Sequence, residues 1–184
     1  MIRNTDKSWG APARLLHWLV AALVFVQIGL GWAAVSWPLS PAKLDLFVWH
    51  KSTGMLILAL MLVRIAWRLA NRAPELPSAM PSLERCAARA SHLLLYMLLL
   101  ALPLTGWIVT SAANVPFRIF WFVPLPAIVE PNKAVADAAA FVHSLLFIAF
   151  ALLLLVHISA ALRHHFVARN DVLMRMLRGT GCPT

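Results

Sequence analysis

Long apolar runs separated by short polar and proline-rich segments are the main pattern along this chain. Four runs reach the roughly 20 residues that a helix needs to cross the hydrocarbon core of a bilayer. They cover residues 15–35, 46–69, 92–112 and 135–162. Helix breakers lie between them, within residues 37–41, 73–81 and 116–131. The pattern predicts an all-α integral membrane four-helix bundle, with residues 1–184 forming a single membrane domain.

Composition agrees with a membrane protein. Hydrophobic residues make up 61% of the chain, whereas about 45–50% is usual in soluble domains. The net charge is +9, but the basic residues are dispersed between apolar runs and form no block with interleaved aromatics. We therefore expect membrane lipids, and no nucleic acid, as partners. The first run lacks a convincing small-residue cleavage site, so we expect it to remain as a span.

The distribution of positive charge predicts the orientation. Most of the sixteen lysine and arginine residues flank one side of the predicted spans, and the other side holds only Lys43, Lys51, Arg118 and Lys133. Because Lys and Arg prefer the cytoplasm, we expect a multi-pass protein of a bacterial inner membrane with both termini cytoplasmic. The apolar segment 115–125 is too short to span and is expected to lie along the outer interface.

Four histidines lie within or at the edge of predicted spans, where ionisable side chains are costly and mark function. His17 and His50 open the first two spans, and His143 and His157 lie on the fourth. Antiparallel spans bring His17 level with His157 near the cytoplasmic side, and His50 level with His143 near the outer side. The spacing of fourteen from His143 to His157 returns within about 40° of one helix face and separates the rings by about 21 Å. Two facing histidine pairs result.

A porphyrin iron with two axial imidazoles needs one histidine from each of two facing helices. The pairs therefore predict two b-type haems in the bundle core. Cys86 and Cys182 belong to no C-x-x-C-H pattern, so the haems would be noncovalent. A zinc or copper site would gather its ligands around one point, and unrelated polar core histidines remain the plain alternative. Two histidine ligands fill both axial positions of an iron, which leaves outer-sphere electron transfer as the chemistry.

The same fourteen-residue spacing leads from His17 to Gly31 and from His50 to Arg64. Gly31 would face the outer haem, where a missing side chain lets a flat macrocycle approach; Gly54 could do the same, and helix packing is the alternative for both. Arg64 would face the inner haem and neutralise its propionates, unless its side chain only extends to the inner interface.

Two further histidines lie near the inner boundary. His164 follows His157 by seven residues and so lies nearly on the same helix face, about 10 Å further toward the cytoplasm. It could donate a hydrogen bond to a quinone or a propionate, or it could be an interfacial histidine of a basic run. His92 begins the third span without a level partner, and we expect an interfacial or supporting role.

The chain resembles the prokaryotic cytochrome b561 family, which is related to the membrane cytochrome subunit of nickel-iron hydrogenases. The resemblance runs from about Pro12 to Leu177. It rests on RLLHWLV, HKSTGMLILALMLVRIAWRL, LLLYMLLLALPLTGW and HSLLFIAFALLLLVHISAALRHHF. The family implies a four-helix, di-haem, inner-membrane electron-transfer protein whose ligands correspond to His17, His50, His143 and His157. The outer segment from Ser111 to Asp137 departs from the family pattern.

The resemblance also implies a reaction. Some similar members oxidise superoxide at the outer face and pass the electron to ubiquinone, and the quinone-contacting position corresponds to His164. The chain would then be an oxidoreductase, with Lys51 and Arg118 as candidates for steering the anion, although nearby acidic residues make the steering local. The alternative is a cytochrome b anchor subunit that links a dehydrogenase or hydrogenase partner to the quinone pool. A transporter without haem would need broken, gated helices, which the uninterrupted runs do not indicate.

Overall fold

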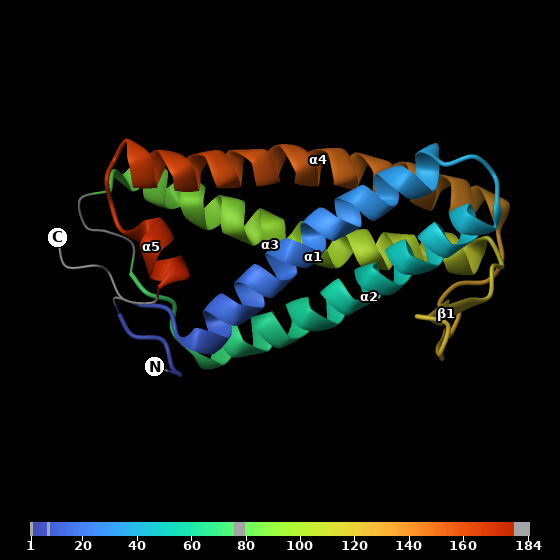
Figure 1. Cartoon of the computed structure of the whole chain (residues 1–184), viewed down its shortest axis with the longest axis horizontal. Coiled ribbons are helices and arrows are strands. Elements are labelled where there is room, and N and C mark those ends of the chain that lie inside the picture. The colour runs from blue at the N-terminus through green and yellow to red at the C-terminus, as the bar shows by residue number, and fades with distance from the viewer. Residues whose placement is uncertain (1, 7, 76–79, 179–184) are drawn as a thin grey trace. The chain divides into compact units, whose positions relative to one another are not determined.

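The computed structural model describes residues 2–6, 8–75 and 80–178, and most of these residues are helical. Figure 1 draws the helices and strands along the chain and labels all of them except β2. They are α1 (Ala11–Ser36), α2 (Pro41–Ala70), α3 (Ser82–Ala112), β1 (Phe117–Ile119), β2 (Val123–Leu125), α4 (Lys133–Phe166) and α5 (Val172–Leu177). Within the described residues, α1 to α4 are the four helices long and apolar enough to cross a membrane. The protein thus has the four membrane-span-like helices that a four-helix bundle requires.

The long helices extend beyond the apolar runs that predict them. Helix α2 begins at Pro41, a residue whose fixed φ suits the first helical position. Helix α3 begins at Ser82, ten residues before the predicted span at 92, because its first turns consist largely of alanine, arginine and leucine, which favour helix in water as well. Hydropathy therefore locates the membrane-spanning part of each helix and underestimates the helix itself.

Large apolar side chains cover the outside of these helices. Trp32, Val35, Leu69 and Phe141 are between 65% and 84% exposed. A helix that is apolar on all sides belongs either in a protein core or in lipid, and these side chains are not in a core. Such exposure is typical of the lipid-facing surface of a membrane protein.

The segment expected to lie along the interface forms a hairpin, Phe117–Leu125. Strands β1 and β2 pair antiparallel, with Phe117 opposite Leu125 and Ile119 opposite Val123. The turn between them is closed by the Phe122 N–H, which donates to the Ile119 carbonyl at 3.0 Å. Its two central residues, Phe120 and Trp121, have φ of 46° and 67°, as primed hairpin turns require. Asn-Gly is the usual sequence for such a turn. The hairpin was not predicted because this signal is absent from residues 117–125.

The described parts of the chain group into two compact units, each with sections of all four long helices. The His17 unit comprises Met1–Leu19, Leu62–Met97 and Phe150–Thr184, and the His50 unit comprises Val20–Met61 and Leu98–Ala149. In the His17 unit, α5 is held to the start of α1 by Arg14 and Trp18, which donate to the carbonyls of Leu177 and Met176 at 3.2 Å and 3.0 Å.

The two cysteines bear on how a haem could be attached. Cys86, on α3, is an exposed free thiol. Cys182 lies outside the described residues.

Candidate functional site

In the His50 unit, α2 and α4 bring His50 and His143 together. The ring centroids are 6.4 Å apart and the ring planes are inclined by 79°. Two metal–nitrogen bonds of about 2 Å, plus roughly 1 Å from each nitrogen to its ring centre, separate the centroids of trans imidazoles by about 6 Å. The spacing therefore suits two imidazoles that share one iron.

Small residues leave room around both rings. A Cβ added at Gly31 would lie 2.9 Å from His50 Cε1, and one at Gly106 would lie 3.5 Å from His143 Cε1. The first distance is shorter than real Cβ contacts allow, so His50 keeps its position only because residue 31 is glycine. Gly106 is a neighbour of His143 that sequence reasoning missed, since it lies on the third helix, where no ligand was expected.

Gln27 supports His50 from α1. Its Nε2 donates to the His50 carbonyl at 2.9 Å and lies 3.4 Å from His50 Nε2. A Cβ at Gly54 would lie 3.2 Å from this amide nitrogen, so Gly54 keeps the approach to His50 open. Within the described residues, His50 Nδ1 and Gln27 Oε1 are buried without a hydrogen-bond partner, so these two atoms retain hydrogen-bonding capacity for a bound group. Gln27 is the one amide inside the first apolar run, a signal that could have been noticed.

Thr105 lies within hydrogen-bonding distance of His143. Its hydroxyl lies 2.9 Å from the carbonyls of Ala101 and Leu102 and 3.0 Å from His143 Nδ1. A hydroxyl has one proton, and when the proton goes to a helix carbonyl the oxygen accepts from His143 Nδ1–H. The imidazole then presents a bare Nε2, as a metal-ligating histidine does.

In the His17 unit, α1 and α4 bring His17 and His157 together with the same separation. The centroids are again 6.4 Å apart, and the planes are inclined by 69°. His92 lies beside His157, with a centroid separation of 5.4 Å. The sequence left His92 without a level partner, so this contact is a finding of the structure.

Cations and a phenol surround the His17/His157 pair. The Arg64 guanidinium lies 3.0 Å from His17 Nδ1 and donates through Nε to the Tyr96 hydroxyl at 2.9 Å. Arg68 lies over the Tyr96 ring, 5.5 Å from its centroid. The structure thus brings Arg64 to the pair at which the fourteen-residue spacing placed it. Tyr96 was missed because nothing in the spacing along its own helix relates it to a ligand.

His164 lies in a polar cluster at the end of α4. The Asn170 amide nitrogen is 2.9 Å from His164 Nδ1, and Glu84 Oε2 is 3.8 Å from His164 Nε2. Arg163 pairs with the other oxygen of Glu84 at 3.3 Å. The histidine is therefore linked to a carboxylate that is about one-third exposed.

The four basic residues expected on the outer side of the membrane differ in their surroundings. Lys43 donates to the carbonyls of Val35 and Trp37 at the end of α1, and Lys133 pairs with Asp137 at 2.7 Å. Lys51 lies 5.5 Å from the centroid of the Phe117 ring. Arg118 follows Phe117 on β1. Within the described ranges, no ion pair involves Lys51 or Arg118.

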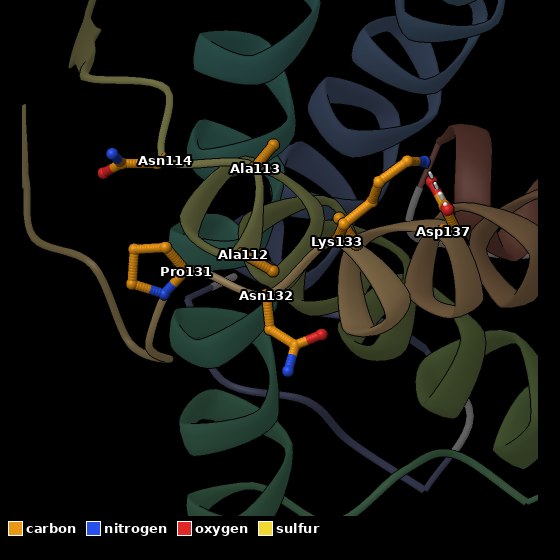
Figure 2. Close-up of a pocket in the computed structure, with 8 residues that line it drawn as sticks. Ala112, Ala113, Asn114, Pro131, Asn132, Lys133 and Asp137 are labelled. Carbon is orange, nitrogen blue, oxygen red and sulfur yellow. Dashed lines mark hydrogen bonds and ion pairs between the residues drawn. The ribbon is translucent and has the colours of Figure 1, made fainter.

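A shallow hollow of about 480 Å³ lies at the connection between α3 and α4, where Figure 2 shows Lys133 and Asp137 joined at its edge. Its lining consists of Ala112, Ala113, Asn114, Pro131, Asn132, Lys133, Ala136 and Asp137. None of these residues is a histidine, so the hollow is separate from the chemistry described above.

Four helices long and apolar enough to span a membrane, with two close histidine pairs between them, are typical of multi-pass membrane cytochromes. Residues 8–179 match the prokaryotic cytochrome b561 family, and the chain belongs to that family. It is thus a membrane haem protein of electron transfer, and the family implies haem b.

Three similar proteins agree with the assignment to this family. Cytochrome b561 homolog 2 of Escherichia coli (strain K12) is 34% identical over 181 residues, which is 95% of this chain and 93% of the relative. The probable superoxide oxidase CybB of Yersinia pestis is 28% identical over 166 residues, 88% of this chain and 91% of the relative. Cytochrome b561 homolog 1 of Escherichia coli (strain K12) is 26% identical over 166 residues, 88% of this chain and 92% of the relative.

Proposed function

We propose that the chain binds two b haems, one between His50 and His143 and one between His17 and His157, and passes electrons from the outer face of a bacterial inner membrane to ubiquinone. The observation that carries this proposal is the recurrence of one ring separation, 6.4 Å, in both pairs. Haem b supplies a one-electron couple to each pair. With both termini in the cytoplasm, as the positive charges indicate, His50/His143 is the outer pair.

Arg64 has a defined task at the inner pair. An imidazole that binds iron through Nε2 carries its proton on Nδ1 and cannot accept a hydrogen bond there. Arg64, now 3.0 Å from His17 Nδ1, is then free for an anionic partner such as a haem propionate, with which a guanidinium forms strong paired hydrogen bonds. Tyr96 keeps the guanidinium in place through Nε.

Superoxide is the proposed electron donor. Two superoxide anions give up two electrons and leave as dioxygen, and the two electrons with two protons reduce one quinone to quinol. Lys51 and Arg118 attract the anion. His164 binds the quinone, and the partly exposed Glu84, whose carboxylate lies 3.8 Å from His164, connects it with cytoplasmic protons. The relative named a probable superoxide oxidase supports this donor.

Stopped-flow reduction of quinone-free protein by superoxide tests the donor. We expect fast haem reduction that slows with ionic strength and slows again in Lys51→Gln or Arg118→Gln, because screening and neutralisation both remove attraction. The double variant Lys133→Gln/Asp137→Asn is the matched control, because it removes an exposed ion pair without changing the net charge. A rate that is insensitive to salt, to Lys51→Gln and to Arg118→Gln rejects superoxide as the donor.

Addition of ubiquinone in a second mixing step tests the exit of electrons. His164→Ala should slow haem re-oxidation and leave haem reduction unchanged. Equal slowing of both steps would give His164 a structural role only.

One observation favours a second function, a cytochrome b anchor for a partner dehydrogenase or hydrogenase. The hairpin exposes Phe122 by 80%, Val123 by 59% and Trp121 by 42%, and an exposed apolar patch can dock a protein. Co-purification of a periplasmic redox protein that reduces the haems faster than superoxide does would favour this function.

A further inference from the structure

The hairpin Phe117–Leu125 is fastened to the turn of α2 that carries His50. The Ser52 side chain is completely buried, and its hydroxyl accepts a hydrogen bond of 2.7 Å from the Phe120 backbone N–H. A buried N–H without a partner is costly, so this bond ties the tip of the hairpin to the helix.

Two neighbours of His50 make further contacts with the hairpin. Trp49 meets Phe120 and Trp121 edge-on, with centroid separations of 5.7 Å and 5.3 Å, and Lys51 lies over the Phe117 ring. Successive helical residues are about 100° apart. Residues 49, 51 and 52 therefore cover the sides of α2 that His50 does not use.

The hairpin depends on these contacts in turn. Phe120 and Trp121 are bulky residues with positive φ, a conformation that costs free energy in any residue with a side chain. Such a turn persists when its surroundings hold it. Here Ser52 pairs with the Phe120 amide, and Trp49 packs against both aromatic rings of the turn.

We propose that Ser52 is a positioning residue, which fastens the hairpin as a clamp on the back of α2 and so keeps His50 in place as an axial ligand. The proposal rests on the proposed haem site at His50 and His143. On the α1 side, Gln27 donates to the His50 carbonyl and Gly31 leaves room for the His50 ring, while the hairpin braces α2 on its other sides. The His50 turn is thereby held from opposite sides.

Hydrogen exchange tests the clamp without reference to electron transfer. In Ser52→Ala, the amide of Phe120 should exchange about tenfold faster, because the buried donor loses its partner. Ser52→Thr retains a hydroxyl and should restore slow exchange. Thr110→Ala is the matched control, because Thr110 is also buried and its hydroxyl donates to Gly106 of its own helix. Unchanged exchange in Ser52→Ala overturns the clamp.

Carbon monoxide binding to the reduced protein tests the effect on the ligand. A six-coordinate haem binds carbon monoxide only after an axial histidine leaves, so a loosened His50 turn should raise the rate at the outer haem about tenfold and leave the inner haem unchanged. Faster exchange without this change would show that the hairpin does not position His50, and an equal change at both haems would indicate general destabilisation. Protein that holds no haem at His50 would refute the proposed function, whereas the exchange result would stand.

Discussion

The His50/His143 pair and the His17/His157 pair have equal ring separations but different surroundings. Around His50 and His143 the contacts come from glycines, an amide and a hydroxyl: Gly31, Gly106, Gln27 and Thr105. Around His17 and His157 they come from Arg64, with Arg68 and Tyr96 behind it, and from His92. The groups that contact the first pair are neutral, with the cation Lys51 next to His50 in the chain, whereas the second pair lies beside two arginines.

This difference affects the energetics of electron transfer. Net charge and hydrogen bonding near a haem set its reduction potential. A nearby cation disfavours the more positive ferric form, so the cationic surroundings should raise the potential of a haem at His17/His157 relative to one at His50/His143. Electron transfer from a haem at His50/His143 to a haem at His17/His157 is then downhill in free energy. This is the direction that the proposed function needs.

The largest expected effect is the separate loss of one haem. His143→Ala should remove the haem at His50/His143, and His157→Ala should remove the other, because each substitution leaves one axial ligand. Haem quantification by pyridine haemochrome, with reduced-minus-oxidised spectra, should give two haems in the unmodified protein and one different haem in each variant. Loss of the same spectral component in both variants would show that the pairs are wrongly assigned.

The next largest effect is expected for Gly31→Leu, which should lose most of the haem at His50/His143. The added side chain begins 2.9 Å from the His50 ring, so it displaces the ligand although the only histidine of its own helix, His17, belongs to the other pair. Gly29→Leu is the control, because a Cβ there meets no atom within 4 Å. Haemochrome assays and spectra compare the haem content of Gly31→Leu with that of Gly29→Leu. Equal haem content in the two variants would mean that residue 31 only packs helices.

Features of the fold and the site that depend on a single helix could be predicted from the sequence. Apolar length predicted the four helices, and the fourteen-residue spacing predicted which histidines share a face. The neighbours on the third helix could not be predicted. Thr105 and Gly106 lie beside His143 and Tyr96 contacts Arg64 through packing between helices, which no spacing along one helix encodes. The hairpin was missed for another reason, since Phe120 and Trp121 adopt positive φ through contacts with Ser52 and Trp49 and not through their own preference.

Thr105→Val should have a smaller effect on haem binding. Valine keeps the shape and removes the hydroxyl that accepts from His143 Nδ1, so the proton position and ring orientation are no longer fixed. Loss of such a supporting contact costs about tenfold in ligand-site affinity. Haem titration of the apoprotein measures it, with Thr110→Val as control, because that hydroxyl donates to its own helix. Equal affinities in the two variants would remove Thr105 from the site.

The smallest expected effect is a change of potential at His17/His157 in Arg64→Gln. Removing a cation favours the ferric form, so the midpoint potential of this haem should fall by roughly 50 mV, the shift that an interaction of about 1 kcal/mol gives a one-electron couple. Tyr96→Phe keeps the charge and removes only the hydrogen bond to Arg64 Nε, so its shift should be smaller. Potentiometric titration followed at the two haem spectra separates the sites, and the haem at His50/His143 serves as the internal reference in each variant. A fall of both potentials by the same amount would show that Arg64 acts through the fold. An unchanged potential at His17/His157 would show that charge does not distinguish the two pairs, and the proposed downhill direction would then need another cause.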